Sequence, residues 1–504
     1  MKFRSLFFLL LSVIPFFSIA QQITYTHPEN EDVRSINFEI IGKVSGNFLV
    51  YKNIRARNTV SVYDNDMNLK EKVDLDFMTE KTINTDFIAY PDFAYIIYQY
   101  QKRSIIHCMA VKIDGNGKKI NNPIELDTTH IGIFSDNKIY TTINSEDKQK
   151  IMIYKIQKKN EKFNFTTLLF NSELALQHTS RLEIPYDERK DVFSDFFVDN
   201  EGAFVFAQSA KSATREYVSK LFFVTKAAQS DRFETNELSL NNHYLDEVIL
   251  KVDNVNRRYD LSSFYYDQKR GNINGLYSVI WDKQTNKPLS TNITEFNDEL
   301  KREAKTSGSV KFALNDYFIR NIILKKDGGF ILSAEDFSSQ SRGNTWNRMD
   351  YLYSYPYMSA SDYYLYSPSS YWYYYRQRNN FGSSLSRYYY NNILVINVDK
   401  DGKLVWTNVI HKEQFDDGDD NFLSYQIMNA GGELHYLFNE LERRNQLIAD
   451  QSITADGKLT RNPTLKSLDK GYEFMPKFAK QVSAKQIIVP CIYRNYICFA
   501  KIDY

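Results

Sequence analysis

Four aspartates around one glycine form the densest group of potential metal ligands in the chain. Asp416, Asp417, Asp419 and Asp420 flank Gly418, and carboxylate oxygens are ligands that Ca²⁺ prefers. Their spacing matches no Ca²⁺-binding loop, so the segment is interpreted as a solvated acidic turn and its aspartates as weak metal candidates. The histidines show no metal-ligand spacing, and the chain has no HExxH, GxSxG or Cys-x-x-Cys motif. We therefore predict no metal and no cofactor.

Carboxylate catalysis is the one reaction class for which the composition supplies the groups. The chain has 62 Asp and Glu residues, and a glycosidase needs two carboxyl groups that the fold brings to one bond. Such partners can lie far apart in sequence, so the sequence does not select a pair. No catalytic residue is predicted, and a glycan-cleaving site is kept as an alternative.

The strongest indication of binding is a tyrosine-rich insertion at about residues 338–392. Tyr, Trp and Arg with Ser and Gly are typical of recognition surfaces, because the rings offer large contact areas with few rotatable bonds. The same rings could stack on sugar faces. The alternative is a low-complexity insert that buries its own rings or stays mobile. The predicted partner-binding residues are Tyr351, Tyr353, Tyr355, Tyr363, Tyr364, Tyr371, Trp372, Tyr373, Tyr374, Tyr375, Arg376 and Arg378.

Two of the three cysteines lie symmetrically about a predicted turn. A two-residue turn at Arg494-Asn495 would place Cys491 and Cys498 opposite each other on neighbouring strands. They form either a disulfide, which an oxidising compartment permits, or two buried thiols. The sequence leaves both states open.

The elements that position these residues are β-hairpins. The segment from Ile393 to Ile410, ILVINVDKDGKLVWTNVI, has two apolar strands around a turn made by Asp399, Asp401 and Gly402. Similar hairpins recur, and each follows another strand-turn-strand segment, which gives four antiparallel strands per repeat. The third strands fall near residues 60, 110, 151, 221, 276, 394, 448 and 496.

The last repeat lacks a fourth strand, and the N-terminal region has a spare one. The chain stops at Tyr504, after the third strand of that repeat, whereas Ile23 to Thr26 precedes the first repeat. Pairing of this segment with Tyr496 to Ile502 would close a circular array and cover two strand edges. We therefore predict an all-β fold, a single β-propeller over residues 21–504. Eight four-stranded blades are favoured, with seven as the alternative if the loose repeat from Glu247 to Phe296 distorts its neighbour.

Two kinds of connection meet at one end of such an array: those between second and third strands, and those between consecutive repeats. They are longer than the turns at the other end and include residues 171–191 and the tyrosine-rich insertion. This irregular face is the predicted functional face. Its charges nearly cancel and the chain has a net charge of +1, so no nucleic-acid partner is expected.

The N-terminus has the pattern of a secretory signal peptide over residues 1–20. Lys2 and Arg4 precede a short apolar run that ends in the small-residue pattern Ser18-Ile19-Ala20. No later segment reaches the length needed to span a membrane. We therefore expect an exported protein without a transmembrane segment in the mature chain, located in the periplasm, associated with the outer membrane, or secreted.

Several segments resemble an uncharacterised family of exported β-propellers of the Bacteroidetes. They are the signal peptide, the tyrosine-rich insertion, DGGF ending at Phe330, DKDGKLVW from Asp399, and YDQKRGNINGLYSVIWDK ending at Lys283. The resemblance covers nearly the whole mature chain. It implies an exported propeller and no activity, since none is assigned to the family.

These observations favour a non-catalytic binding or scaffold protein of the bacterial envelope. Its expected partner is an envelope protein or assembly, bound through the irregular face and the insertion. The alternative is a glycan-binding or glycan-cleaving propeller with a carboxylate pair at the central channel.

Overall fold

A computed structural model describes residues 21–29, 36–54, 57–78, 81–131, 138–159, 162–187, 190–212, 217–269, 271–306, 308–341, 348, 386–418, 420–442, 445–465 and 471–504. The predicted signal peptide, 1–20, lies outside these residues. Within them the strands form seven hydrogen-bonded sheets, and neighbouring strands run antiparallel. The predicted all-β class is therefore confirmed.

The first three sheets are four-stranded meanders in which each strand pairs with the next. Sheet one contains β2 (Ile36–Val44), β3 (Asn47–Ile54), β4 (Arg57–Tyr63) and β5 (Leu69–Asp74). Sheet two contains β6 (Thr82–Ala89), β7 (Phe93–Lys102), β8 (Ile105–Asp114) and β9 (Ile124–His130). Sheet three contains β10 (Thr141–Asn144), β11 (Lys150–Lys159), β12 (Lys162–Asn171) and β13 (Leu176–Pro185).

Sheet four has ten strands because two successive meanders are joined through one short strand, β19, which pairs with β17 and β21. The first meander contains β14 (Asp191–Phe193), β15 (Phe197–Val198), β16 (Phe204–Lys211), β17 (Val218–Lys226) and β18 (Glu234–Leu238). The second contains β19 (Tyr244–Leu245), β20 (Ile249–Asp253), β21 (Arg258–Tyr266), β22 (Gly275–Asp282) and β23 (Lys287–Glu295).

The last three sheets follow a helix and a short 3₁₀ turn, α1 (Asp298–Ala304) and η2 (Val310–Phe312). Sheet five contains β24 (Tyr317–Leu324), β25 (Phe330–Ser341), β26 (Ser386–Val398), β27 (Leu404–Ile410) and β28 (Gln414–Asp417). Sheet six contains β29 (Tyr425–Ala430), β30 (Glu433–Glu442), β31 (Asn445–Thr454) and β32 (Leu459–Arg461). Sheet seven contains β33 (Tyr472–Phe474), β34 (Lys480–Ser483), β35 (Gln486–Tyr493), β36 (Tyr496–Asp503) and β1 (Gln22–Tyr25), with η3 (Pro476–Phe478) before β34.

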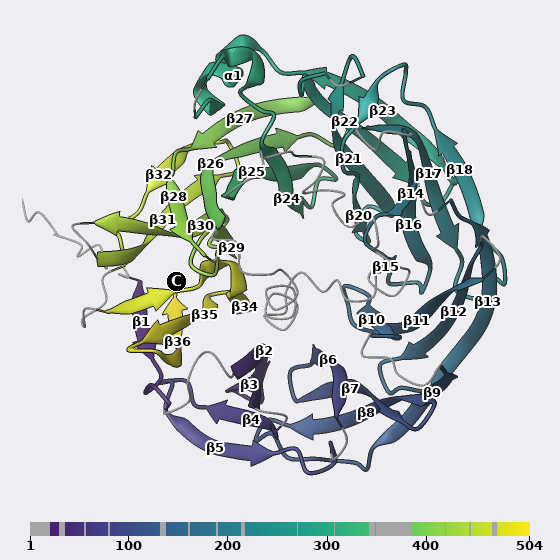
Figure 1. Ribbon diagram of the computed structural model, residues 1–504, viewed down its shortest axis with the longest axis vertical. Coiled ribbons are helices and arrows are strands. Elements are labelled where there is room, and N and C mark those ends of the chain that lie inside the picture. Colours follow the sequence, from purple (N-terminus) through teal and green to yellow (C-terminus); the bar gives the residue numbers. More distant parts are fainter. Residues whose placement is uncertain are drawn as a thin grey trace, which may run out of the picture.

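The sheets follow one another around a common centre in chain order (Figure 1). The first strands of the meanders, among them β2, β6, β20 and β24, lie innermost (Figure 1). The apolar core lies between neighbouring sheets: one buried cluster contains Ile97 of sheet two and Ile153 of sheet three, and another contains Phe38 of sheet one and Ile488 of sheet seven. Each sheet therefore buries both of its faces against its two neighbours.

One turn design repeats at the end of the third strand of several meanders. The side-chain oxygen of Asp64, Asp114, Asn171 or Asp399 accepts hydrogen bonds from the backbone N–H groups two and four residues further on. Such bonds stabilise a tight turn and explain why Asp and Asn recur there. In the predicted hairpin Gly402 takes a left-handed conformation with φ of 81°, and a Cβ there would meet Asn292 of the preceding meander.

The N-terminal strand closes the last sheet as predicted. β1 pairs with β36 in the register Ile23 with Ile502 and Tyr25 with Ala500, and the Thr26 N–H donates to the Phe499 carbonyl at 2.9 Å. Beyond the strand, Glu29 accepts hydrogen bonds from Lys52 and Tyr63 of sheet one. The N-terminal segment thus joins the last sheet to the first.

Two details of the prediction were wrong. The hairpin that starts near Ile151 was expected to form third and fourth strands, but β11 and β12 are the second and third strands of sheet three. The fourth strand, β13, occupies the segment 171–191 that was expected to be an irregular connection. The insertion is also shorter than 338–392, because β25 continues to Ser341 and β26 begins at Ser386.

The helical content described is small. Among the residues that the structure describes, no helix is long and apolar enough to cross a membrane.

The Glu29 contact makes closure testable by pH. Burial alone would raise the pKa of Glu29, but Lys52 and Tyr63 lower it below its ordinary value of 4.5. A carboxyl group whose pKa is lower in the folded than in the unfolded protein stabilises the fold at pH values above its ordinary pKa of 4.5. This stabilisation is lost as the pH falls through the lower, folded-state pKa. We expect Glu29→Gln to lower the free energy of unfolding by about 3 kcal/mol at neutral pH, since Lys52 is fully buried. The difference from the wild type should vanish in acid, as followed by thermal unfolding.

The matched control is Asp74→Asn in the solvent-exposed Arg57–Asp74 pair, where the side chains are 68% and 54% exposed. Solvent screens such pairs, so this change should cost less than about 1 kcal/mol. Equal losses in the two variants would contradict a special role of Glu29 in closure.

Candidate functional site

Three carboxylates gather where the two meanders of sheet four begin at the centre of the ring. Asp195 directly precedes the β15 region, and Asp246 and Glu247 directly precede β20, both strands being innermost (Figure 1). Asp195 and Glu247 are exposed, whereas Asp246 is buried. This place at the start of the inner strands β15 and β20 is called the mouth of the ring below.

Asp246 is held by an arginine from within the insertion. The Arg348 guanidinium lies 2.5 Å from the Asp246 carboxylate, donates to the Asn315 carbonyl at 3.0 Å and stacks on the Phe318 ring at 3.8 Å. The Tyr266 hydroxyl donates to the same carboxylate at 2.9 Å. The Asp246 carboxylate is thus paired with Arg348 and Tyr266. Through Arg348, the insertion contacts the region of the three carboxylates.

Glu247 differs from Asp246 in having neither hydrogen bond nor ion pair among the described residues. Its side chain is exposed, yet the protein around the mouth of the ring removes much of the surrounding water. Desolvation, together with the negative charges of Asp246 and Asp195, raises the pKa of Glu247 to about 7, and the positive charges of Arg320 and Arg348 oppose this rise. Glu247 is therefore an accessible carboxyl group that can hold or release a proton near neutral pH.

Asp195 is the other exposed carboxyl group at this place. Desolvation raises its pKa above the ordinary value of 3.8, and the positive charge of Lys251 opposes this rise. Its charge in turn raises the pKa of Glu247, so the two carboxyl groups lie close enough to interact. Cleavage of a glycosidic bond uses two carboxyl groups at one place.

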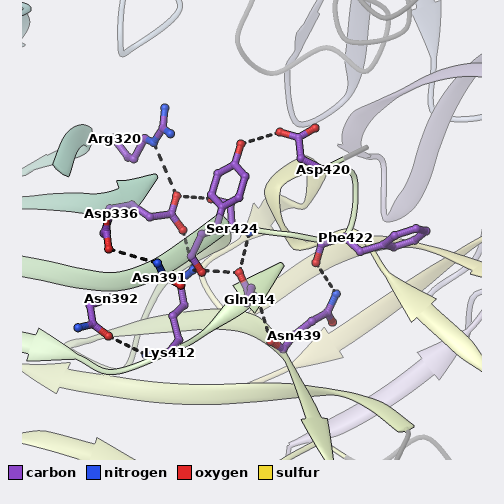
Figure 2. A network of polar contacts seen from close by, with 12 residues as sticks. Arg320, Asp336, Asn391, Asn392, Lys412, Gln414, Asp420, Phe422, Ser424 and Asn439 are labelled. Atoms are coloured by element: carbon purple, nitrogen blue, oxygen red, sulfur yellow. Dashed lines mark hydrogen bonds and ion pairs between the residues drawn. The ribbon is translucent and has the colours of Figure 1, made fainter. Parts of the chain in front are cut away.

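Behind the mouth, a buried polar network fixes the base of sheet five. The Lys412 ammonium lies 2.8 Å from the fully buried Glu335 carboxylate and donates to Gln414 at 2.9 Å. The Ser424 hydroxyl donates to Glu335 at 2.6 Å. Figure 2 shows Lys412, Gln414 and Ser424 converging from the strands and connections of sheets five and six. A buried ion pair of this kind is maintained only when its hydrogen bonds are satisfied.

Arg320 connects this network to the mouth of the ring. Its guanidinium lies 3.6 Å from Glu335, and the side chain is partly exposed. It also lowers the pKa of Glu247 through its charge. The buried network therefore positions one of the cations that act on the exposed carboxyl group.

Another glutamate with a raised pKa, Glu39, lies elsewhere in the ring. Desolvation raises the pKa of the half-buried Glu39 on β2 to about 7, opposed by Lys480 and Lys138. The Lys480 ammonium itself donates to the carbonyls of Ile40 and Ile41. Because these contacts join sheets one and seven, Glu39 is assigned to the closure of the ring.

The predicted partner-binding residues lie outside the described residues. They are Tyr351, Tyr353, Tyr355, Tyr363, Tyr364, Tyr371, Trp372, Tyr373, Tyr374, Tyr375, Arg376 and Arg378. The structure shows where their segment enters and leaves: Ser341 and Ser386 are register partners at the tip of a ribbon formed by β25, β26 and β28. The insertion thus interrupts a second-to-third-strand connection, as predicted.

The acidic segment 416–420 does not gather its carboxylates at one point. Asp417 forms a two-pronged pair with Arg387 at 2.7 and 2.8 Å. Asp420 contacts the Tyr390 hydroxyl at 2.6 Å and the Lys477 ammonium at 2.8 Å. Asp416 lies on β28 beside them, and Asp419 lies outside the described residues. Asp417 and Asp420 thus pair with different cations, and the solvated turn was a wrong interpretation for Asp420.

Sequence reasoning did not find Asp195, Asp246, Glu247 or Arg348. A signal for two of them was present, because Asp195 and Glu247 each precede an apolar triplet that starts an inner strand, FFV and VIL. The fold itself does not require an acidic residue at this position, so its recurrence in two consecutive meanders was a possible sign of function. Arg348 had no such signal, since its partner is 102 residues away.

Comparison with known proteins gives remote likenesses. No family model matches the chain, and no curated protein matches it in sequence. The polysaccharide lyase Uly1 has a TM-score of 0.38 and 11% identity over 83% of this chain and 89% of its own. An ulvan lyase of the polysaccharide lyase family PL25 has a TM-score of 0.36 and 10% identity over 82% and 90%.

A prolyl oligopeptidase B from Galerina marginata has a TM-score of 0.39 and 8% identity. The likeness covers 91% of this chain but 55% of the peptidase, so this chain spans about half of that protein's length. At these values the three likenesses assign neither an activity nor a site.

The anchoring role of Arg348 predicts a large effect on stability. Arg348→Met would leave the Asp246 carboxylate, which is 3% exposed, buried without its cation, at an expected loss of about 3–5 kcal/mol in unfolding free energy. Adding Asp246→Asn to the Arg348→Met variant should recover a substantial part of the lost unfolding free energy, because a neutral amide removes the unpaired charge. Denaturant unfolding of both variants measures the difference.

The matched control is Arg387→Met, on the ribbon formed by β25, β26 and β28. Its pair with Asp417 is exposed, with 44% and 58% of the side chains accessible, so the loss should stay below about 1 kcal/mol. A loss in Arg348→Met as small as in this control would show that Arg348 does not anchor the insertion.

Proposed function

We propose that the protein binds a neutral glycan at the mouth of the ring and that Glu247 supplies the proton for cleavage of a glycosidic bond. The observation that carries the proposal is the pair of exposed carboxyl groups, Glu247 and Asp195, at the starts of two inner strands, of which Glu247 has a pKa raised to about 7. Glycoside cleavage requires one carboxyl group that is protonated and one that is ionised.

The balance of fixed charges supports a neutral ligand. The mouth contains side chains of both signs, which include the acidic Asp195, Asp246, Glu247 and Asp316 and the basic Lys251, Arg320 and Arg348. Charges of opposite sign side by side give little net attraction for a polyanion. They do offer many donors and acceptors, which suit the hydroxyl groups of a sugar.

Each residue has a distinct role in the proposed reaction. Glu247 donates its proton to the glycosidic oxygen as the bond from that oxygen to the sugar carbon breaks. Asp195, beside Lys251, accepts a proton from the water molecule whose oxygen forms the new bond to that carbon. Exchange with solvent then returns the proton from Asp195 to Glu247. Arg348 pairs with the buried Asp246 and holds it in place, so Arg348 and Asp246 are positioning residues.

The proposed architecture is an exported, eight-bladed β-propeller. Sheet four is interpreted as two blades that β19 joins, and the pairing of β1 with β36 supports closure of the ring. The signal-peptide pattern in residues 1–20 supports export to the periplasm, the outer membrane or the medium. Membership of the uncharacterised Bacteroidetes family is part of the same proposal.

A second candidate function is recognition of an envelope protein by the insertion. The observation that favours it is the base of the insertion, a three-stranded ribbon braced by the Arg387–Asp417 pair on the irregular face. Large tyrosine-rich segments on a rigid base are suited to recognition. This candidate needs no reaction at Glu247.

Glycan cleavage is tested with Glu247→Gln. The amide preserves size and hydrogen bonding but cannot donate the catalytic proton, so turnover of a panel of neutral oligosaccharides should fall at least about 100-fold while their binding persists. In the wild type the acid form of Glu247 is populated below its pKa and lost above it. The rate should therefore fall about tenfold per pH unit above a pKa of about 7.

Glu237→Gln is the matched control, since Glu237 lies exposed on β18 at the outer rim. It should leave binding and turnover unchanged. Binding of oligosaccharides without turnover by the wild type would disprove the catalytic part and keep the glycan site. Absence of binding to any neutral glycan would disprove both.

The second candidate is tested by replacing residues 349–385 with a short Gly-Ser linker that retains Arg348. We expect the melting temperature and glycan binding to be preserved, because the ends of the insertion lie at register partners. Loss of a crosslinked partner from the native envelope in this variant alone would establish the insertion as a recognition element. Retention of that partner would exclude it.

A further inference from the structure

Cys491 and Cys498 lie opposite each other at the centre of the sheet that closes the ring. They are register partners on β35 and β36, and both are fully buried. The turn between the strands is the predicted one, with Arg494 and Asn495 at positive φ values of 49° and 69°. Two consecutive positive φ values define a two-residue hairpin turn that fixes the register.

This register gives a backbone separation suited to a disulfide. In a two-residue hairpin the residues flanking the turn, Tyr493 and Tyr496, form a hydrogen-bonded pair. Cys491 and Cys498 are the next such pair, two positions further along. Opposed residues of this type have Cα atoms about 5.5 Å apart, which is the commonest separation in disulfides.

The side chains also face each other. The two sulfur atoms lie 2.8 Å apart, within the distance at which unbonded sulfur atoms repel. The third cysteine, Cys108, belongs to a different core cluster between sheets two and three. Each of the two thiols therefore has one sulfur within reach, that of the other.

We propose that Cys491 and Cys498 form a cross-strand disulfide when the chain folds in an oxidising compartment. The two thiols lose two protons and two electrons and one S–S bond forms. The electrons pass to the disulfide of a protein thiol–disulfide oxidant, which is reduced to two thiols. The proposal is independent of the glycan site.

The position of the pair determines when the bond can form. Exchange requires a thiolate that the oxidant can reach, but burial raises the pKa of the Cys491 thiol well above its ordinary value. β1 also covers the free edge of β36 in the closed ring. The hairpin must therefore be oxidised before β1 pairs, and a ring that closes in the reduced state remains reduced.

The chain provides a direct assay, because trypsin cleaves between the two cysteines. Cleavage after Lys485, Arg494 and Lys501 gives the peptides QIIVPCIYR and NYICFAK. Wild-type protein folded with a disulfide oxidant is denatured with an alkylating reagent and digested without reduction. We expect the two peptides to be joined, with alkylation at Cys108 only, and to separate after reduction.

Two variants and one reference preparation complete the experiment. Cys108→Ser should contain no alkylated cysteine after oxidative folding, and Cys491→Ser should leave both remaining cysteines alkylated. Protein that is folded under reducing conditions and then exposed to the same oxidant should stay alkylated at all three positions. The oxidised wild type should melt a few degrees above the reduced form.

Three alkylated cysteines in wild type folded with the oxidant would overturn the proposal, as would a disulfide that includes Cys108. Ready oxidation of the closed, reduced ring would overturn the proposed order of oxidation and closure. Because the wild type carries the decisive measurement, a variant that fails to fold does not affect the outcome.

Discussion

Hydrogen bonds between β1 and β36 join opposite ends of the chain, and the relative positions of the sheets depend on this pairing. Each sheet packs only on its two neighbours around the centre (Figure 1). The Glu29 contacts with Lys52 and Tyr63 then fix sheet one against sheet seven. The first and last sheets in the chain are therefore held together by one N-terminal segment.

Much of the fold could be predicted because its determinants are local. The oxygen of Asp399 organises its turn through hydrogen bonds within four residues, and alternating apolar residues mark the strands beside it. The N-terminal strand could be predicted because the last repeat lacked a fourth strand. The assignment failed at β13, LQHTSRLEIP, where polar residues face solvent on an outer strand and weaken the apolar pattern.

The site was much less predictable than the fold. Asp246 and Arg348 are 102 residues apart and come from a connection and an insertion, so no short motif relates them. The Lys412–Glu335 pair likewise depends on packing between distant segments. The raised pKa of Glu247 is due mainly to desolvation by the assembled sheets, with a further contribution from the adjacent Asp246. Tyrosine-rich composition drew attention to the insertion, whereas its described contact with the ring is made by an arginine.

The pairing of β1 has a further consequence for the time during which the chain is vulnerable. The Thr26 N–H donates to the Phe499 carbonyl and the Phe499 N–H donates to the Thr26 hydroxyl, and these two residues are 473 residues apart. Synthesis of the intervening chain at 5–20 residues per second takes roughly 25 to 100 s. Throughout this period β1 has no edge to pair with in its own molecule. Two chains at the same stage can exchange their first strands, which gives a swapped pair that satisfies the same hydrogen bonds. Local concentration during biogenesis therefore determines how many molecules close on themselves.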